Sequence, residues 1–164
     1  MRVVLDTNIL VSALLIQTGH PAAIYRAWHE GYFKLLTCAE QLDELRATLH
    51  KPALAARIRP YKAGRLINQL RELAETVDKL PRVERPIDPT DDFLLALSES
   101  GKADYLVTGD KSGLLALVGH RSTRIVSARD FAASLEGSQT ATGGGEGRKS
   151  VKSRPRSSNA GRLT

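Results

Sequence analysis

Apolar runs alternate with amphipathic segments along the first 136 residues, and two of the apolar runs end in an acid. Residues 2–6 form a short β-branched and leucine-rich run that ends at Asp6. A second such run, at 104–110, ends at Asp110. Runs of this length and composition predict buried strands. Helical periodicity occurs between the apolar runs, at 8–16, 22–30, 39–50 and 61–77.

The remaining segments continue the same alternation. Further strands are expected at 32–38, at 125–126 and, as a short one, between 77 and 80. Further helices are expected at 93–101, 114–118 and 128–135, with a break at Gly19-His20-Pro21 and a loop from Pro81 to Pro89. Strands that alternate with helices predict an α/β fold, in which helices cover both faces of a mostly parallel sheet. Ligands of such sheets bind at the carboxyl ends of the strands, where the strand order reverses.

Composition and length fit a single globular domain. The chain has 164 residues, of which 41% are hydrophobic and 26% charged. Cys38 is the sole cysteine, so no internal disulfide can form. Only three apolar residues separate Arg2 from Asp6, too few for a signal peptide, and no apolar run approaches the ~20 residues that span a bilayer. These features predict a cytoplasmic protein without a membrane segment.

The composition changes sharply after residue 136. Residues 137–164 hold six basic residues against Glu146, which is +5 of the chain's net charge of +6. This stretch is rich in glycine and serine, and Val151 and Leu163 are its only large apolar residues. We therefore expect a folded domain at 1–136 and a disordered basic tail at 137–164. The tail is either an inert extension or a binder of RNA phosphates.

Four acidic positions are candidates for one site, and two of them, Asp6 and Asp110, converge if their strands are neighbours at the switch point. Asp6 and Asp110 each end an apolar strand, Asp91 precedes a helix, and Glu44 lies on the helix at 39–50. Gathered carboxylates repel one another, and a hard cation such as Mg²⁺ or Mn²⁺ removes that cost. A bound water then becomes a nucleophile suited to phosphodiester hydrolysis. Zinc is disfavoured because the four histidines are scattered, and spacing leaves Asp43, Asp88, Asp92 and Asp104 as substitutes.

Each acid also has an ordinary structural explanation. Asp6, Asp91 and Asp110 all stand where a helix needs an N-cap, and Glu44 could be a surface residue of its helix. Asn8 and Thr108 likewise suit turns and caps. Capping alone does not explain two buried strands, about a hundred residues apart, that each deliver an acid at the carboxyl end.

Four motifs in this order resemble the PIN-domain family, in particular its branch of toxins from toxin–antitoxin pairs. They are Val-Leu-Asp-Thr-Asn at 4–8, Glu44-Leu45, Asp-Pro-Thr-Asp-Asp-Phe-Leu-Leu-Ala-Leu at 88–97, and Ala-Asp-Tyr-Leu-Val-Thr-Gly-Asp-Lys at 103–111. The resemblance covers about residues 2–135. It implies a three-layer α/β/α fold with about five mostly parallel strands. It also implies a ribonuclease that depends on Mg²⁺ or Mn²⁺.

The resemblance assigns a role to each acid. It implies that Asp6, Glu44, Asp91 and Asp110 hold the metal and catalyse, with Asn8, Thr108 and Asp92 in support. The branch often has a further acid at the position of Ser112, so a second metal ion is less well supported than the first. Implied partners are RNA, a cognate antitoxin inserted into the acidic cleft, and a second copy in a homodimer.

Two other functions remain open at this stage. A catalytically weak RNA-binding or regulatory module would keep the acids without turnover. A phosphatase with Asp6 as nucleophile would want a second aspartate two residues on, where the chain has Asn8.

Overall fold

A computed structural model describes residues 1–83, 92–109 and 113–142 of the chain. Strands and helices alternate through most of these residues, as the sequence predicts. In order they are β1 (Arg2–Leu5), α1 (Thr7–Leu15), α2 (His20–His29), β2 (Lys34–Thr37), α3 (Ala39–Leu49), α4 (Pro52–Ala55), α5 (Pro60–Leu73), β3 (Glu75–Thr76), α6 (Asp92–Ser100), β4 (Tyr105–Val107), the 3₁₀ helix η2 (Leu114–Leu117), β5 (Gly119–His120), β6 (Thr123–Val126) and α7 (Ala128–Thr142).

The strands form one sheet with the order β3-β2-β1-β4-β6-β5. Every neighbouring pair is parallel except β5 and β6, which form an antiparallel hairpin at one edge. The chain adds β2 on one side of β1 and β4 on the other. The strand order therefore reverses beside β1, and Asp6, the residue after β1, lies at the switch point.

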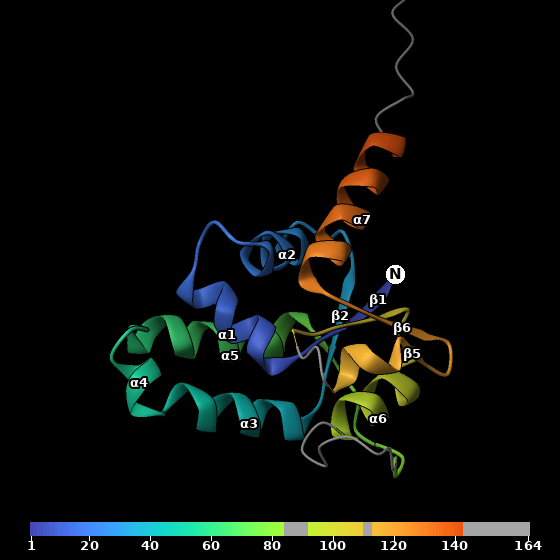
Figure 1. Ribbon diagram of the computed structural model, residues 1–164. Helices are drawn as coiled ribbons and strands as arrows, with labels where there is room; N and C mark the ends of the chain where they lie inside the picture. The colour runs from blue at the N-terminus through green and yellow to red at the C-terminus, as the bar shows by residue number, and fades with distance from the viewer. Residues whose placement is uncertain (84–91, 110–112, 143–164) are drawn as a thin grey trace, which may run out of the picture.

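Alternate residues of the central strands enter two separate cores. Val3 and Leu5 pack in one core with α1, α2, α3, α5 and α7, whereas Val4 packs in the other with α6 and η2. The same alternation separates Leu35 from Leu36 on β2. The sheet is therefore covered on both faces, which makes a three-layer α/β/α fold (Figure 1). Burial on both faces explains why these strands are apolar throughout.

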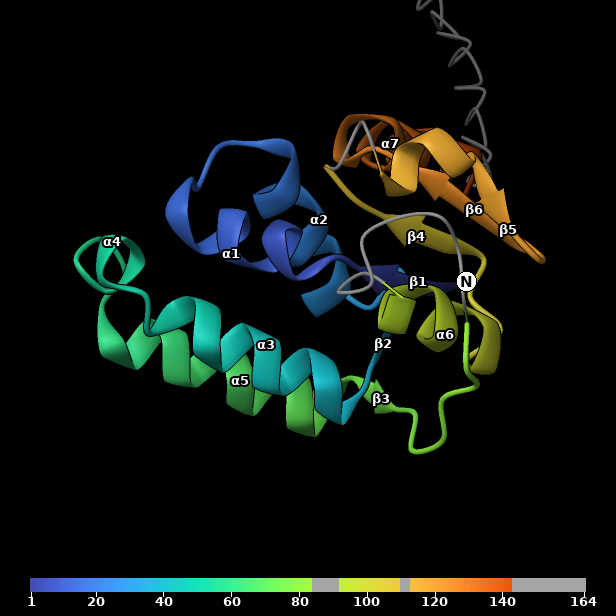
Figure 2. The same ribbon diagram turned by 60° about the horizontal axis from the view of Figure 1, so that its bottom comes forward.

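The helices α3 and α5 pack side by side and project from the sheet as an arm, with α4 at its tip (Figure 2). Leu45 and Leu49 of α3, Ile58, and Leu66 and Leu70 of α5 are buried along this arm. The arm joins the rest of the molecule at the carboxyl ends of β1 and β2, where α3 begins.

Several element boundaries differ from those that the sequence predicts. α2 begins at His20 instead of after Pro21, because proline is tolerated in the first turn of a helix. The helix expected at 61–77 ends at Leu73, and β3 takes up Glu75–Thr76 in place of a strand at 77–80. Pairing with β2 fixes that position, since Leu36 and Thr37 lie opposite Glu75 and Thr76.

The antiparallel hairpin at the sheet edge was not predicted. β5 pairs with β6, which gives six strands in place of about five. Arg121 in the turn has a φ of 55°, a conformation that usually calls for glycine or asparagine. Nearby, His120 is buried and its Nε2 lies 3.0 Å from Glu99 Oε2 on α6.

The last helix is longer than predicted. α7 runs from Ala128 to Thr142, so the boundary expected at residue 136 falls inside it. Figure 1 shows the end of α7 pointing away from the sheet. The residues beyond Thr142 lie outside the described part of the chain. Among the residues that are described, no helix has both the length and the hydrophobicity that a bilayer crossing requires.

An ion-pair clamp closes the amino edge of the sheet, opposite Asp6. The Arg2 guanidinium donates to both carboxylate oxygens of Glu75, at 3.0 and 2.8 Å, and its Nε donates to the Gly101 carbonyl at 2.7 Å. Lys34 Nζ lies 3.4 Å from the same carboxylate. The hydrogen bond from Arg2 is the main cause that lowers the pKa of Glu75 from 4.5 to about 2.

We expect Glu75→Gln to destabilise the fold at pH 7 and to have progressively less effect in acid. The lowered pKa means that the folded state prefers the ionised carboxylate. That stabilisation is complete above pH 4.5 and is lost as the pH falls toward 2. Urea unfolding of both proteins across this range measures the difference. Glu72→Gln, at an exposed position of α5, is the matched control and should have no pH-dependent effect.

Candidate active site

Asp6 lies at the carboxyl end of the central strand and is 7% exposed. Its Oδ1 accepts a 3.2 Å hydrogen bond from the Asn8 amide, which makes Asp6 the N-cap of α1. Its backbone amide donates to the Val107 carbonyl of β4, at 2.9 Å. The cap and the strand pairing together fix where the carboxylate lies.

Thr108 brings a second polar group to Asp6 from the neighbouring strand. Thr108 follows β4 directly and is fully buried. Its Oγ1 donates to Asp6 Oδ2 at 2.7 Å, although the two residues are 102 positions apart. The strands that precede Asp6 and Thr108 are parallel neighbours, so their carboxyl ends lie side by side. Asp110, two residues farther on, lies outside the described residues.

Glu44 reaches the same edge from α3. Thr7, the residue after Asp6, donates from Oγ1 to Glu44 Oε2 at 2.7 Å. Asp43, the alternative on the same helix, is 78% exposed at its side chain and lies 3.6 Å from Arg46. The structure thus distinguishes two adjacent acids that spacing alone could not.

Gln41 is a buried polar residue of this edge that the sequence analysis missed. It is 1% exposed and lies one helical turn before Glu44. Its Nε2 donates to the Leu5 carbonyl at 2.6 Å, and its Oε1 accepts from Thr37 Oγ1 at 2.9 Å. The side chain therefore joins the start of α3 to the carboxyl ends of β1 and β2. A glutamine four residues before buried Leu45 was the available signal, because i and i+4 share a helix face.

Asp92 begins α6 and is half-buried. Its Oδ1 is buried and has no hydrogen-bond partner among the described residues. A buried carboxylate oxygen without a partner is costly, and a cation is one means of satisfying it. α6 packs against β1 and α3, the elements that carry Asp6 and Glu44.

The remaining predicted positions divide into two groups. Asp104 accepts from the Arg2 amide at the amino edge of the sheet, so it is not part of this site. Asp91, Asp110, Ser112 and the substitute Asp88 lie outside the described residues. Within the described part, no three Asp, Glu, His or Cys side chains form a group that could hold a metal ion.

We call the side chains of Asp6, Glu44 and Asp92, together with the strand ends beside them, the acid edge. Its donor atoms suit a hard cation. Asp6, Glu44 and Asp92 offer carboxylate oxygens, which Mg²⁺ and Mn²⁺ prefer. Cys38 begins α3 at this edge, but its burial raises the pKa of the thiol to about 12. The thiol therefore stays protonated near neutral pH and is a poor ligand for a soft metal.

Comparisons with known proteins agree with this architecture. The family model of the PIN domain matches residues 2–112. PAE2754 from Pyrobaculum aerophilum is similar in structure, with a TM-score of 0.57 and 18% identity over 84% of this chain and 90% of that one. VapBC2 from Rickettsia felis, solved bound to a DNA fragment from the promoter, is also similar. Its TM-score is 0.51 and its sequence identity 14%, over 77% of this chain and 98% of that one. At sequence identities this low, the structural similarity shows a shared fold alone. A search of curated proteins found no match.

Proposed function

The chain belongs to the PIN-domain family, and from this premise we propose that it is a metal-dependent endoribonuclease, the toxin of a toxin–antitoxin pair. PIN domains are generally nucleases. The proposal adds that the substrate is RNA, that the metal is Mg²⁺ or Mn²⁺, and that Asp6, Glu44, Asp91 and Asp110 are the ligands and catalytic groups.

One observation carries the proposal. Asp6 follows β1, Thr108 follows β4 and Glu44 lies on α3. Thr108 donates to Asp6 at 2.7 Å, and Thr7, the next residue along the chain after Asp6, donates to Glu44 at 2.7 Å. Residues that are 37 and 102 positions apart thus meet at the switch point of the sheet, where ligands of this fold class bind. Capping of α1 requires Asp6 alone and does not account for Glu44 or Thr108.

The side chains have separate tasks in the proposed reaction. A divalent ion, when bound, would supply a water of lowered pKa and would neutralise charge on the phosphate oxygens. Asp6 and Glu44 would hold that ion, with Asp91 and Asp110 completing the set and Asp92 in support. Thr108 holds the Asp6 carboxylate in one orientation, and Thr7 does the same for Glu44. Asn8 supports the site through its backbone amide.

Metal removal tests the proposal directly. We expect cleavage of a labelled RNA to stop in EDTA and to return when Mg²⁺ or Mn²⁺ is added in excess. The reason is that the acid edge offers carboxylates and no described histidine to act as a general base. Gel analysis of the products, with heat-treated protein as the control for contaminating nuclease, is the measurement. Undiminished cleavage in EDTA would contradict the metal dependence.

The proposed partner is an antitoxin protein that blocks the acid edge. Its support is the structural similarity to VapBC2 and the order of the four sequence motifs. A second copy of the chain, as a homodimer, is part of the same proposal.

A further inference from the structure

Charge is segregated within the folded domain. We define the basic arm as residues 45–71, which include the outer part of α3, all of α4 and most of α5. The basic arm contains seven lysines and arginines and no acid. Residues 1–44 and 72–136 together contain 11 basic and 17 acidic residues, a net charge of −6. Because these charges nearly cancel, the net charge of residues 1–136 as a whole is close to zero.

Most cations of the basic arm are available to a partner. Lys51, Arg57, Arg59 and Arg65 are exposed, and Lys62 is half-buried. None of these five forms a salt bridge with a described residue, whereas the surface pairs elsewhere in the domain include Arg121 with Glu99 and Lys34 with Glu75. A surface whose cations are not neutralised by acidic neighbours attracts anions.

An aromatic side chain lies among these cations. Tyr61 is 61% exposed and stands between Arg59 and Lys62 at the start of α5. Basic groups interleaved with an exposed aromatic ring are typical of surfaces that bind single-stranded nucleic acid, where phosphates pair with the cations and a base stacks on the ring.

The basic arm begins close to the acid edge. Glu44, which accepts from Thr7, is on the same helix as the start of the arm. α3 ends at Leu49, five residues after Glu44 and roughly 8 Å farther along the helix axis at ~1.5 Å per residue, and Lys51 follows just beyond that end. A nucleic-acid strand that crosses the acid edge can therefore continue along the arm.

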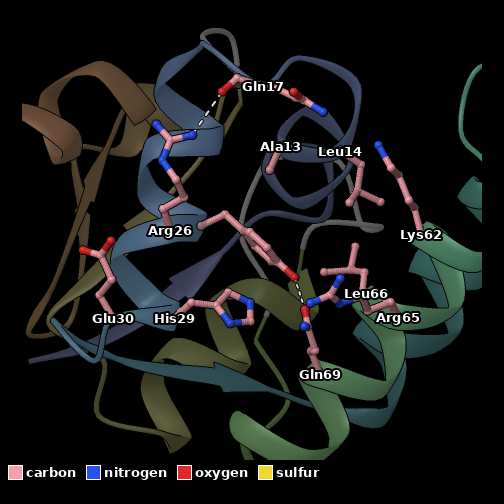
Figure 3. Close-up of a pocket in the computed structure, with 11 residues that line it drawn as sticks. Ala13, Leu14, Gln17, Arg26, His29, Glu30, Lys62, Arg65, Leu66 and Gln69 are labelled. Carbon is pink, nitrogen blue, oxygen red and sulfur yellow. Dashed lines mark hydrogen bonds between the residues drawn. The ribbon is translucent and has the colours of Figure 1, made fainter.

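A cavity of about 430 Å³ lies between the arm and the helices α1 and α2, and three of the side chains that line it are cationic (Figure 3). Lys62 and Arg65 of α5 line it, as do Arg26 and Glu30 of α2, and Arg26 donates to the Gln17 carbonyl at 3.0 Å. Within it the Tyr25 hydroxyl donates to Gln69. The cavity also reaches Ala13 and Leu14 in the second half of α1, so the cations that line it lie on the side of the arm that faces α1 and α2.

We propose that the basic arm binds the phosphate backbone of the RNA substrate and holds the strand across the acid edge. This inference rests on the proposed function, since it names how the substrate of that site is bound. The charge pattern favours nucleic acid over an acidic protein. The arm exposes one large apolar side chain, Tyr61, whereas protein interfaces need an apolar core of several.

The test compares two triple variants of the full chain with equal loss of charge. The first is Arg57→Gln/Arg59→Gln/Arg65→Gln in the arm. The matched control is Lys102→Gln/Arg124→Gln/Arg129→Gln, at exposed positions on the opposite part of the sheet. Binding of a labelled, 2′-O-methyl single-stranded oligonucleotide is followed by fluorescence anisotropy in EDTA over a series of salt concentrations. Circular dichroism verifies the fold of each variant.

We expect the arm variant to bind the oligonucleotide at least about tenfold more weakly than the wild-type chain. The slope of log affinity against log salt concentration should fall in magnitude by about 2, because three cations are removed and each single-strand phosphate contact contributes ~0.7. The control should keep most of the affinity of the wild-type chain. Equal affinities of wild type and arm variant overturn the proposal, and so do equal losses in both variants.

Poly-glutamate is the probe for the competing class of partner. Loss of poly-glutamate binding in the arm variant, with oligonucleotide binding intact, would reject RNA in favour of an acidic protein segment. Because binding is measured in EDTA, the result does not depend on cleavage. A chain that binds through its arm and cleaves nothing would refute the nuclease proposal alone.

Discussion

Asp6→Asn is expected to lower metal-dependent RNA cleavage about a thousandfold and to leave the unfolding temperature close to that of the wild-type chain. A metal ion supplies several kcal/mol of transition-state stabilisation, and ~4 kcal/mol corresponds to a thousandfold in rate. Asparagine keeps the shape of aspartate but loses the charge that holds a cation. Single-turnover cleavage of a labelled RNA measures the rate, and thermal unfolding measures the stability.

The substitution separates the two explanations of Asp6. Asparagine caps a helix about as well as aspartate does, and its Oδ1 can still accept from Asn8 or Thr108. If Asp6 served only as the N-cap of α1, the asparagine variant would be nearly silent. A large loss of rate in a stable protein therefore identifies the charge as the essential property.

Asp43→Asn is the matched control for this experiment. It makes the same chemical change next to Glu44, at a side chain that is 78% exposed. Its cleavage rate should equal that of the wild type. In cells, we expect the wild-type chain and the Asp43 variant to arrest growth and the Asp6 variant not to do so. Equal rates for all three proteins would exclude Asp6 from catalysis.

The central strands could be predicted because burial on both faces demands apolar residues at every position. Val3, Val4 and Leu5 satisfy both cores, so their run is unambiguous in the sequence. The hairpin β5–β6 has no comparable pattern in the sequence. Its turn uses Arg121 at a φ of 55° where the usual signal is glycine or asparagine, and its strand β5 has two residues.

The end of α5 was predicted wrongly because tertiary contacts set it. The amphipathic pattern continues through Ala74 and Val77, so periodicity alone extends the helix. The structure instead holds Glu75 beside Leu36 of β2 and in the ion pair with Arg2. Neither partner is close in sequence, and helical periodicity contains no information about them.

The candidate site shows the same division between local and distant information. An acid after an apolar strand is a local signal, and Asp6 could be found from it. The choice of Glu44 over Asp43 depends on a hydrogen bond from Thr7, 37 residues away. The basic arm leaves no trace in the net charge of residues 1–136, because the acidic residues of the other elements offset its seven cations.

Gln41→Met is expected to weaken Mn²⁺ binding about 10- to 100-fold. The basis is that groups which orient metal ligands from behind typically contribute that much. Methionine matches the length of glutamine but cannot donate to the Leu5 carbonyl or accept from Thr37. The first turn of α3 would then lose its attachment to the strand ends, and Glu44, one turn later, would lose its fixed position. Calorimetric titration of Mn²⁺ gives the affinity.

A general loss of stability must be separated from this positioning effect. Removing Gln41 leaves two polar groups without their partner, which costs about 1–3 kcal/mol, so urea unfolding will also respond. Gln69→Met is the matched control, since Gln69 of α5 accepts from the Tyr25 hydroxyl away from the acid edge. That variant should lose stability and keep its Mn²⁺ affinity. If both methionine variants bind Mn²⁺ equally well, Gln41 serves the fold alone.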